Sequence, residues 1–490
     1  MNLKLIFIYL GLLSTELLIA QNQITELSLK QVIEMARMES PDAQTARHSF
    51  RSAYWNYKYY RANYLPSLSL TSDPNLNRAI NEITMGDGSV KFVEQNLLNT
   101  DLTLNLSQNL SWTGGSFFLE TSAQRMDLFS EHKYSWQTSP IMIGYRQSLF
   151  GYNSLKWDRR IEPVRYQEAK KSYVETLELV SANAIHKFFA LATAQSDYDI
   201  ASFNYANADT LYRYAQGRYN IGTITENEML QLELNRLTEE TNRMNACIEM
   251  DNCMQELRSY LGIHEDRELR VLVSPQIPDF SVNLNEALAL AYENSPDIQT
   301  MERRKLESES AVAKARANAG LKADIYLRFG LTQTADKLPE AYRNLLDQQY
   351  VSIGISLPIL DWGRGKGQVR VARSNRDLVY TQVEQSRTDF ELNVRKLVKQ
   401  FNLQTQRVRI AARTDETAQR RSEVARKLYL LGKSTILDLN ASISEKDSAR
   451  RNYISALYNY WSLYYTLRSM TLYDFERNTI LTEDYHLLIE

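Results

Sequence analysis

The sequence predicts an α+β protein that is mostly helical and is built from two repeats. Three observations support this class. Short motifs recur at fixed spacings, segments of alternating polarity lie between them, and the rest of the chain consists of long runs without glycine or proline. Only 17 glycines and 10 prolines occur in 490 residues, and scarcity of both favours long uninterrupted elements.

Two pairs of motifs define the repeats. Ser40-Pro41-Asp42, with the apolar run before it, recurs as Ser295-Pro296-Asp297, a shift of 255 residues. A second motif, residues 219–228, recurs at 429–438 with a shift of 210. The first repeat therefore carries about 45 extra residues, and the match of Ser148-Leu149 with Ser356-Leu357 places them before residue 148. We expect repeats at 21–275 and 276–490, with strands at about 65–150 and 323–358.

The first 20 residues resemble a secretory signal, with Lys4 ahead of an apolar core and the small residue Ala20 at the cleavage position. Beyond this segment no apolar run approaches the roughly 20 residues that a membrane-spanning helix needs. Any insertion of the exported chain into a membrane must therefore use strands.

Residues 102–112 alternate between apolar and polar side chains, as do 141–149, 325–331 and 351–357. This pattern predicts strands that are polar on one side. A soluble sandwich would alternate as well, but the export signal favours an outer-membrane barrel. The first repeat offers four strand segments (67–71, 101–112, 116–123 and 140–149) and the second offers two, which indicates an added hairpin. Residues 73–99 and 128–140 are then expected to be surface loops, and Thr113-Gly-Gly115 is either a turn at the rim or a bend in a long hairpin.

The remaining sequence predicts long helices, and Gln368–Leu431 contains neither glycine nor proline. Apolar residues recur at sevenfold spacing there in two series, Val383, Phe390 and Leu397, and Val394, Phe401 and Val408. Such narrow stripes are typical of coiled coils. Comparable runs without proline extend from just after Pro163 to Gln216, from 223 to 261, and from 433 to the end of the sequence. Because the other helix faces are polar, a wide tube with a wet interior fits better than a solid core.

Composition excludes several functions. The formal net charge of -2 does not provide the positive field that binding of nucleic acid requires. The five histidines are scattered, without a metal-ligand pair at helical spacing, so we expect no enzyme activity, no metal site and no cofactor. Cys247 and Cys253 lie in one helical run about 9 Å apart, too far for a disulfide, and are predicted to pack.

The glycine-rich stretch Ile359–Arg373 could be a phosphate-binding loop or a joint between elements. Gly363, Gly365 and Gly367 are evenly spaced, which fits neither the dinucleotide fingerprint nor the P-loop. The stretch follows an alternating strand that Pro358 ends and precedes a long helical run. We therefore predict a strand-to-helix joint, with these glycines providing the bend and Trp362 suited to a membrane interface.

The order, duplication and spacing of these motifs resemble the TolC-like outer-membrane efflux proteins. The resemblance implies a homotrimer that shares one β-barrel in the outer membrane and continues as a periplasmic α-helical coiled-coil barrel. It also implies partners, a periplasmic adaptor and an inner-membrane pump, and a channel without catalysis or cofactor that contacts outer-membrane lipid.

The resemblance also assigns roles to residues in the second motif. The hairpin tips, which would dock the adaptor, match Gly222 and Thr225 in the first repeat and Gly432 and Thr435 in the second. The glycines can end one helix, and the threonines can cap the next. The periplasmic aperture matches Tyr219, Glu228, Tyr429 and Asp438. Three copies of each acid around an axis would attract cations.

The chain departs from better-known members at two aperture positions, where it has Ser434 in place of a base and Ala441 in place of an acid. The acidic ring is therefore thinner, and an ion pair of Asp438 with that base cannot form. Two alternatives to small-molecule efflux stay open: a duct of the same fold for type I protein secretion, and an exported coiled-coil scaffold or adhesin. The scaffold would not explain the duplicated strand segments.

Overall fold

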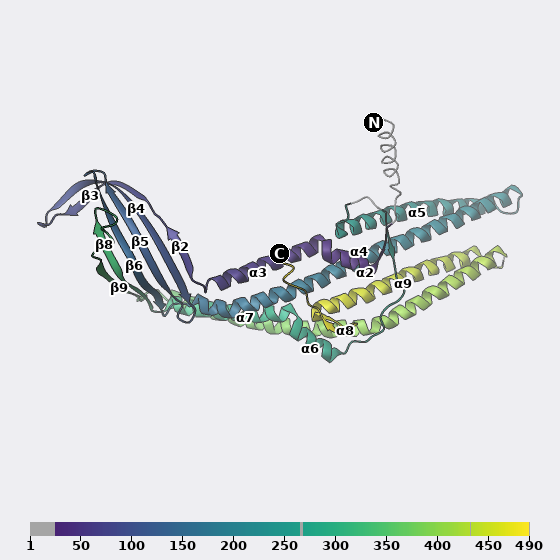
Figure 1. Ribbon diagram of the computed structural model, residues 1–490. Coiled ribbons are helices and arrows are strands. Elements are labelled where there is room, and N and C mark those ends of the chain that lie inside the picture. Colours follow the sequence, from purple (N-terminus) through teal and green to yellow (C-terminus); the bar gives the residue numbers. More distant parts are fainter. Residues whose placement is uncertain (1–24, 265–267, 432, 490) are drawn as a thin grey trace, which may run out of the picture. The chain divides into compact units, whose positions relative to one another are not determined.

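The computed structural model describes residues 25–264, 268–431 and 433–489. The predicted signal segment and Gly432 lie outside the described residues. The chain divides into two compact units, one with most of the strands and one with the two long helical hairpins (Figure 1). The sheet unit comprises 52–169 and 297–387, and the helical unit comprises 25–51, 170–296 and 388–489, apart from the residues that are not described.

The sheet unit contains one antiparallel sheet with contributions from both repeats. Its order is β2 (Ser67–Thr71), β4 (Val90–Leu110), β5 (Gly115–Leu128), β6 (Lys133–Leu149), β8 (Lys322–Ala335) and β9 (Leu346–Ser356). β3 (Asn75–Thr84) also pairs with β4, beyond the stretch that pairs with β2. Six positions across the sheet result, four from the first repeat and two from the second, so the added hairpin predicted from the sequence is present.

The extra residues of the first repeat form strands over most of their length, so the expectation of a surface loop at 73–99 was wrong. β3 and the start of β4 pair from Asn75↔Asn99 to Thr84↔Val90 and make a two-stranded ribbon. The expected loop at 128–140 is also mostly strand, because β6 begins at Lys133. These segments alternate poorly, so their pairing with β4 and β5 sets their conformation more than their own pattern does.

The Thr113–Gly115 tract is a turn between β4 and β5. Gly114 has φ +79°, a left-handed conformation that glycine adopts without strain. A Cβ there would also meet the Asn153 side chain at 2.8 Å. Gln108 and Asn109 donate to the carbonyls of Tyr64 and Asn63 just after the preceding helix. The region of the turn therefore contacts both the segment that leads into the sheet, at residues 63–64, and the segment that leaves it, at Asn153.

The two faces of the sheet differ in chemistry. One face is apolar and exposed and includes Leu68, Leu70, Leu102, Leu104, Leu106, Ile141, Ile143, Val351, Ile353 and Ile355. The opposite face holds an ion pair between Arg328 and Glu120 at 3.2 Å, next to the stacked rings of Phe118 and Tyr326. This arrangement fits a sheet with lipid on one side and water on the other.

Helices of the two repeats match in length. α2 (Leu29–Glu39) and α6 (Leu284–Asn294) have 11 residues each, and α3 (Pro41–Ala62) and α7 (Pro296–Ala319) have 22 and 24. α4 (Ser154–Asn220) and α8 (Arg364–Leu430) have 67 each, and α5 (Glu226–Leu261) and α9 (Ile436–Thr471) have 36 each. Pro163 lies inside α4, which begins nine residues before it. The fold is thus a mostly helical α+β fold made of two repeats.

In the helical unit, α4 with α5 and α8 with α9 form two hairpins (Figure 1). Two small sheets, β1 (Thr25–Ser28) with β7 (Leu269–Leu272) and β10 (Tyr473–Asp474) with β11 (Thr479–Ile480), complete the unit. Arg258 and Ser259 accept hydrogen bonds from Gly262, which ends α5 with φ +71°. Cys247 and Cys253 on α5 are free and half-buried.

The core of the helical unit is a set of narrow stripes with one buried charge cluster. The two heptad series predicted on α8 are buried, with Val394 and Phe401 fully so, and all members except Val383 belong to this unit. Glu178 of α4 has no exposed side-chain surface and binds Arg37 at 2.6 Å and Arg468 at 2.7 Å. This cluster ties α2, α4 and α9 together. None of the described helices combines the length and apolar character of a membrane span.

Candidate functional site: the two hairpin tips

The first hairpin tip is a helix stop followed by a capping box. Gly222 has φ +70° and donates to the carbonyl of Tyr219 at 2.9 Å, while the N–H of Thr223 donates to that of Arg218 at 2.9 Å. This is the Schellman arrangement that ends helices at glycine. Thr225 then starts α5: its hydroxyl accepts from the N–H of Glu228, and its own N–H donates to the Glu228 carboxylate at 2.9 Å.

The described residues of the second tip show the same closure and the same capping box. The N–H of Lys433 donates to the carbonyl of Leu428 at 2.9 Å, the same five-residue closure as in the first tip. Thr435 caps α9 and donates its hydroxyl proton to Asp438 at 2.6 Å, and the N–H of Asp438 donates back to the threonine oxygen at 3.1 Å. The predicted caps at Thr225 and Thr435 are therefore confirmed, and so is the helix stop at Gly222.

Both acids predicted for the aperture belong to these capping boxes. Hydrogen bonds from the side chain and backbone of Thr435 lower the pKa of Asp438, with smaller help from Ser434. The N-terminus of a helix also favours negative charge. Glu228 and Asp438 thus stabilise the tips while remaining exposed charges. Whether they line a pore depends on assembly, and that role stays a prediction.

The two predicted aperture tyrosines have different surroundings. Tyr219 is exposed beside the first tip. Tyr429 of α8 lines a cavity of about 830 Å³ between α4, α5, α8 and α9, which Asn440 and Asp447 of α9 also line. The structure therefore does not place the tyrosines in equivalent surroundings, although they match in the repeat.

The predicted strand-to-helix joint lies between β9 and α8. Trp362 and Gly363 have φ of +54° and +84°, so they make the bend. The Asp361 carboxylate accepts from the N–H groups of Gly363 at 2.9 Å and Gly365 at 2.8 Å, and these bonds lower its pKa. Gly365 lies in the first turn of α8, where a Cβ would approach Ala319 to 3.0 Å. Gly367 is an ordinary helical residue with open space around it, so it does not contribute to the bend.

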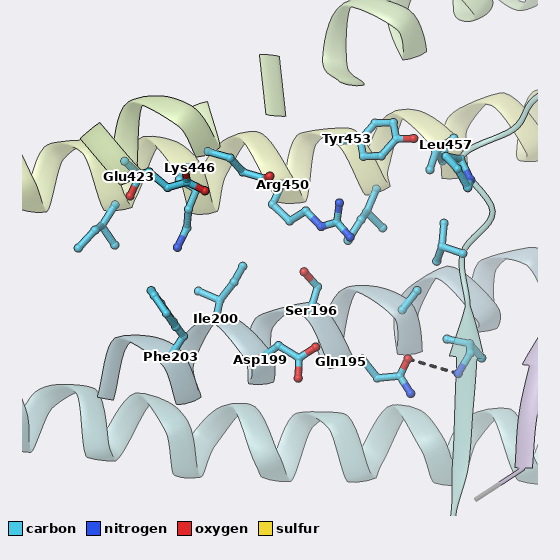
Figure 2. Close-up of a pocket in the computed structure, with 18 of the residues that line it drawn as sticks. Gln195, Ser196, Asp199, Ile200, Phe203, Glu423, Lys446, Arg450, Tyr453 and Leu457 are labelled. Carbon is cyan, nitrogen blue, oxygen red and sulfur yellow. Dashed lines mark hydrogen bonds between the residues drawn. The ribbon is translucent and has the colours of Figure 1, made fainter. Parts of the chain in front are cut away.

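A cavity of about 780 Å³ lies between α4, α8, α9 and β7. Figure 2 shows Asp199 and Phe203 of α4 opposite Lys446 and Arg450 of α9. The Lys446 ammonium lies 4.8 Å from the centre of the Phe203 ring, and Arg450 pairs with the buried Asp415 at 3.1 Å. Four basic side chains and two acidic ones line this space: Arg270, Arg426, Lys446 and Arg450, with Asp199 and Glu423.

Sequence reasoning missed the contacts that join the two hairpins. Arg451 of α9 pairs with Asp197 of α4 at 2.6 Å, and Asn204 donates to Asp447 at 3.0 Å. These residues are far apart in sequence and lie on largely polar helix faces, where a charge normally indicates solvent. No local pattern distinguishes them from solvated residues.

Comparison with known proteins identifies the family. The family model of the outer membrane efflux proteins matches residues 32–263 and 287–471. The chain belongs to the outer membrane efflux protein family. Each matched range covers most of one repeat, and the segment between the ranges connects the two repeats.

Solved outer membrane efflux proteins share the fold. The Campylobacter jejuni CmeC outer membrane channel aligns over 94% of this chain and 88% of its own, with 15% identity and a TM-score of 0.68. VceC of Vibrio cholerae aligns over 90% of this chain and 95% of its own, with 15% identity and a TM-score of 0.64. CusC aligns over 90% of this chain and 91% of its own, with 14% identity and a TM-score of 0.61. The comparison with curated proteins gave no match.

Membership of this family confirms the predicted class of protein and its predicted location in the outer membrane. This outer membrane efflux protein is a TolC-like channel protein of the outer membrane and not an enzyme. A soluble sandwich and an exported scaffold are thereby excluded.

Proposed function

We propose that the chain forms a homotrimeric duct that exports small molecules, which an inner-membrane pump and a periplasmic adaptor pass on to it. The observation that carries the proposal is the efflux family match over both repeats. The sheet supports it further, because β2 and β9 lie at its two edges within the described residues and the exposed apolar face runs from one edge to the other. Three such sheets joined edge to edge would close a barrel and leave no free edge.

In this duct the periplasmic aperture would contain Asp438, Glu228, Tyr429 and Tyr219. The adaptor would dock on the tips at Gly222, Thr225, Gly432 and Thr435. The tips are suited to docking because the Schellman closure and capping boxes fix their backbones, and a fixed surface loses little entropy on binding. Gly363, Gly365 and Trp362 would join the barrel to the helices at the lipid boundary. The repeat boundaries at 21–275 and 276–490, and a signal peptide at 1–20, belong to the same proposal.

Sizing of the protein after mild detergent extraction of the outer membrane tests assembly. We expect a trimer whose mobility on a gel changes on heating, because closed barrels resist denaturation until heated. A monomer without heat-modifiable mobility would contradict the proposal.

Planar-bilayer conductance tests the aperture. Asp438→Ala should lower cation selectivity, since three carboxylates would leave the constriction. Asp438→Asn is the matched control for shape, because it keeps a hydrogen-bond acceptor for the cap and removes only the charge. Equal selectivity in both variants and the parent would count against an acidic ring.

Docking is tested at the helix stops. Proline requires φ near −65°, but Gly222 has φ +70° and donates its N–H. Gly222→Pro, and Gly432→Pro by repeat, should abolish export of small toxic compounds while the trimer persists. Retained resistance in cells that carry trimeric variants would refute the docking role. Secretion of a protein, without any change in resistance when the gene is deleted, would instead indicate a type I secretion duct.

A further inference from the structure

In the sheet unit, the strand–helix junctions lie together at one end of the sheet (Figure 1). α3 leads into β2 and α7 leads into β8, while α4 and α8 begin just after β6 and β9. Leu149 at the end of β6 pairs with Ala323 at the start of β8, and Ser356 at the end of β9 pairs with Lys322. The start of β2 pairs near the end of β4, so its junction belongs to the same end.

Basic residues are concentrated around these junctions. We define the basic belt as residues 58–66, 150–161, 310–323 and 357–373, which lie next to this end of the sheet. These ranges contain twelve lysines and arginines and two acids, a net charge of +10 (12 minus 2), whereas the whole chain has a net charge of -2. The twelve bases are Lys58, Arg61, Lys156, Arg159, Arg160, Lys314, Arg316, Lys322, Arg364, Lys366, Arg370 and Arg373. All twelve are exposed.

The charges of the belt are mostly uncompensated. Among the described residues, only Arg160 of the twelve bases forms an ion pair, with Glu309 at 3.9 Å. Arginines just beyond the belt differ, because Arg165, Arg303 and Arg376 bind carboxylates at 2.7, 2.6 and 2.7 Å. Unpaired charges of one sign repel each other and attract counter-ions of the opposite sign. The belt is therefore suited to bind anions.

An exposed apolar rim lies beside the belt. Trp112 in the turn between β4 and β5 is 79% exposed, and Ile359 and Trp362 between β9 and α8 are 94% and 90% exposed. Leu65 before β2 and Phe150 after β6 are also exposed. Tryptophan and other large apolar side chains are favoured where the hydrocarbon of a membrane meets its headgroups. The rim thus indicates which surroundings the neighbouring bases have.

Three layers of different chemistry follow one another from the sheet to the helices. The sheet has an exposed apolar face, the rim comes next, and the belt begins within a few residues of the rim, with Arg364 two residues after Trp362. A bilayer has the same order, with hydrocarbon, interface and charged headgroups. Clustered lysines and arginines beside a membrane attract anionic lipids, and a guanidinium binds phosphate with two hydrogen bonds.

We propose that the basic belt binds the headgroup phosphates of anionic phospholipids in the membrane leaflet next to the helices. This assignment rests on the proposed function, which places the sheet in the outer membrane, and it adds the class of lipid that surrounds the joint. Lipid is favoured over an anionic solute in water because the same junctions expose large apolar side chains, which water solvates poorly.

Quenching of tryptophan fluorescence by brominated lipids tests the preference. Full-length protein is reconstituted in phosphatidylcholine bilayers that contain increasing fractions of brominated phosphatidylglycerol, which is anionic, or brominated phosphatidylcholine, which is zwitterionic. Trp112 and Trp362 report on lipid at the belt because they are exposed there. At about 10 mM salt we expect the anionic lipid to associate at least about threefold more strongly. At about 1 M salt, where the Debye length is about 3 Å, the preference should disappear.

Substitutions on one helix test the location. Lys366, Arg370 and Arg373 lie four and three residues apart and share one face of α8. The belt variant replaces them together: Lys366→Gln, Arg370→Gln and Arg373→Gln. The control variant removes the same number of exposed bases from the same helix, starting 26 residues beyond Arg373, about 39 Å away: Lys399→Gln, Arg407→Gln and Arg426→Gln. The belt variant should lower the preference at least about twofold, and the control variant should not change it.

The outcomes separate the belt from the duct. Equal association of the two lipids with trimers that conduct would overturn the belt and leave the proposed duct standing. Absence of trimers and of conductance in the parent protein would overturn the duct and the belt with it. Equal loss of preference in the belt and control variants would show that net charge, and not the belt, selects the lipid. Loss of preference in sodium phosphate, but not in sodium chloride of equal ionic strength, would identify free phosphate as the ligand and refute lipid binding.

Discussion

Replacement of Glu178 by alanine should destabilise the helical unit strongly, because this carboxylate is the centre of a buried charge cluster. It has no exposed side-chain surface and binds Arg37 at 2.6 Å and Arg468 at 2.7 and 3.1 Å. Burial alone would lower the pKa of Arg468, but Glu178, together with Tyr465 and Asp474, outweighs burial and raises the pKa. Both arginines are therefore charged in the fold and depend on this acid.

The size of the effect follows from what remains after the substitution. Removal of one partner from a buried ion pair costs about 3–5 kcal/mol. Arg37 keeps Glu483 and Arg468 keeps Asp474, at 2.7 and 2.9 Å, so we expect about 3 kcal/mol, at the lower end of that range. For a cooperative unit of 150–250 residues this lowers Tm by roughly 6–12 °C. Glu178→Gln keeps the shape and should lose less.

Thermal unfolding of the purified protein, followed by circular dichroism of the helices, measures this change. The control is Glu34→Ala on α2, whose pair with Lys30 at 3.9 Å is largely exposed and should contribute about 0–1 kcal/mol. If Glu178→Ala and Glu34→Ala melt at the same temperature, then the buried cluster does not stabilise the fold as argued.

Three further predictions concern the tips and the joint. Thr225→Ala or Thr435→Ala should cost about 0.5–2 kcal/mol and raise amide exchange in the adjoining hairpin, whereas Thr238→Ala on the exposed face of α5 should not. Gly363→Ala should destabilise the fold by about 1–2 kcal/mol, because the φ of Gly363 is +84°. Gly367→Ala, in a helix with open space around it, should stabilise the fold by about 0.5–1 kcal/mol. Equal shifts in Tm for the two variants would contradict this interpretation of the joint. The lowered pKa of Asp438 means that its charge and capping contribution are present above the ordinary value of about 4 and are lost only as pH falls through the lower folded value. Cation selectivity in bilayers should accordingly survive at pH 4, and its loss above pH 5 would contradict the role of Asp438.

The sequence determined the repeats and the local signals. The shifts of 255 and 210 predicted the paired helix starts at residues 41 and 296 and at 226 and 436, because the same local motif begins the same helix in each repeat. Capping at Thr225 and Thr435 and the left-handed Gly222 were likewise readable, since each depends on neighbours within five residues. Six strand positions were predicted for the same reason, from alternation within short segments.

Only the tertiary structure decided what distant residues do together. The ribbon of β3 and β4 is strand because the two segments pair with each other, although neither alternates clearly. The cluster of Glu178, Arg37 and Arg468 unites residues up to 431 positions apart, and Arg451 meets Asp197 across two hairpins. A charge in a helical sequence has the same local pattern whether it is solvated or paired, and only packing fixes its partner.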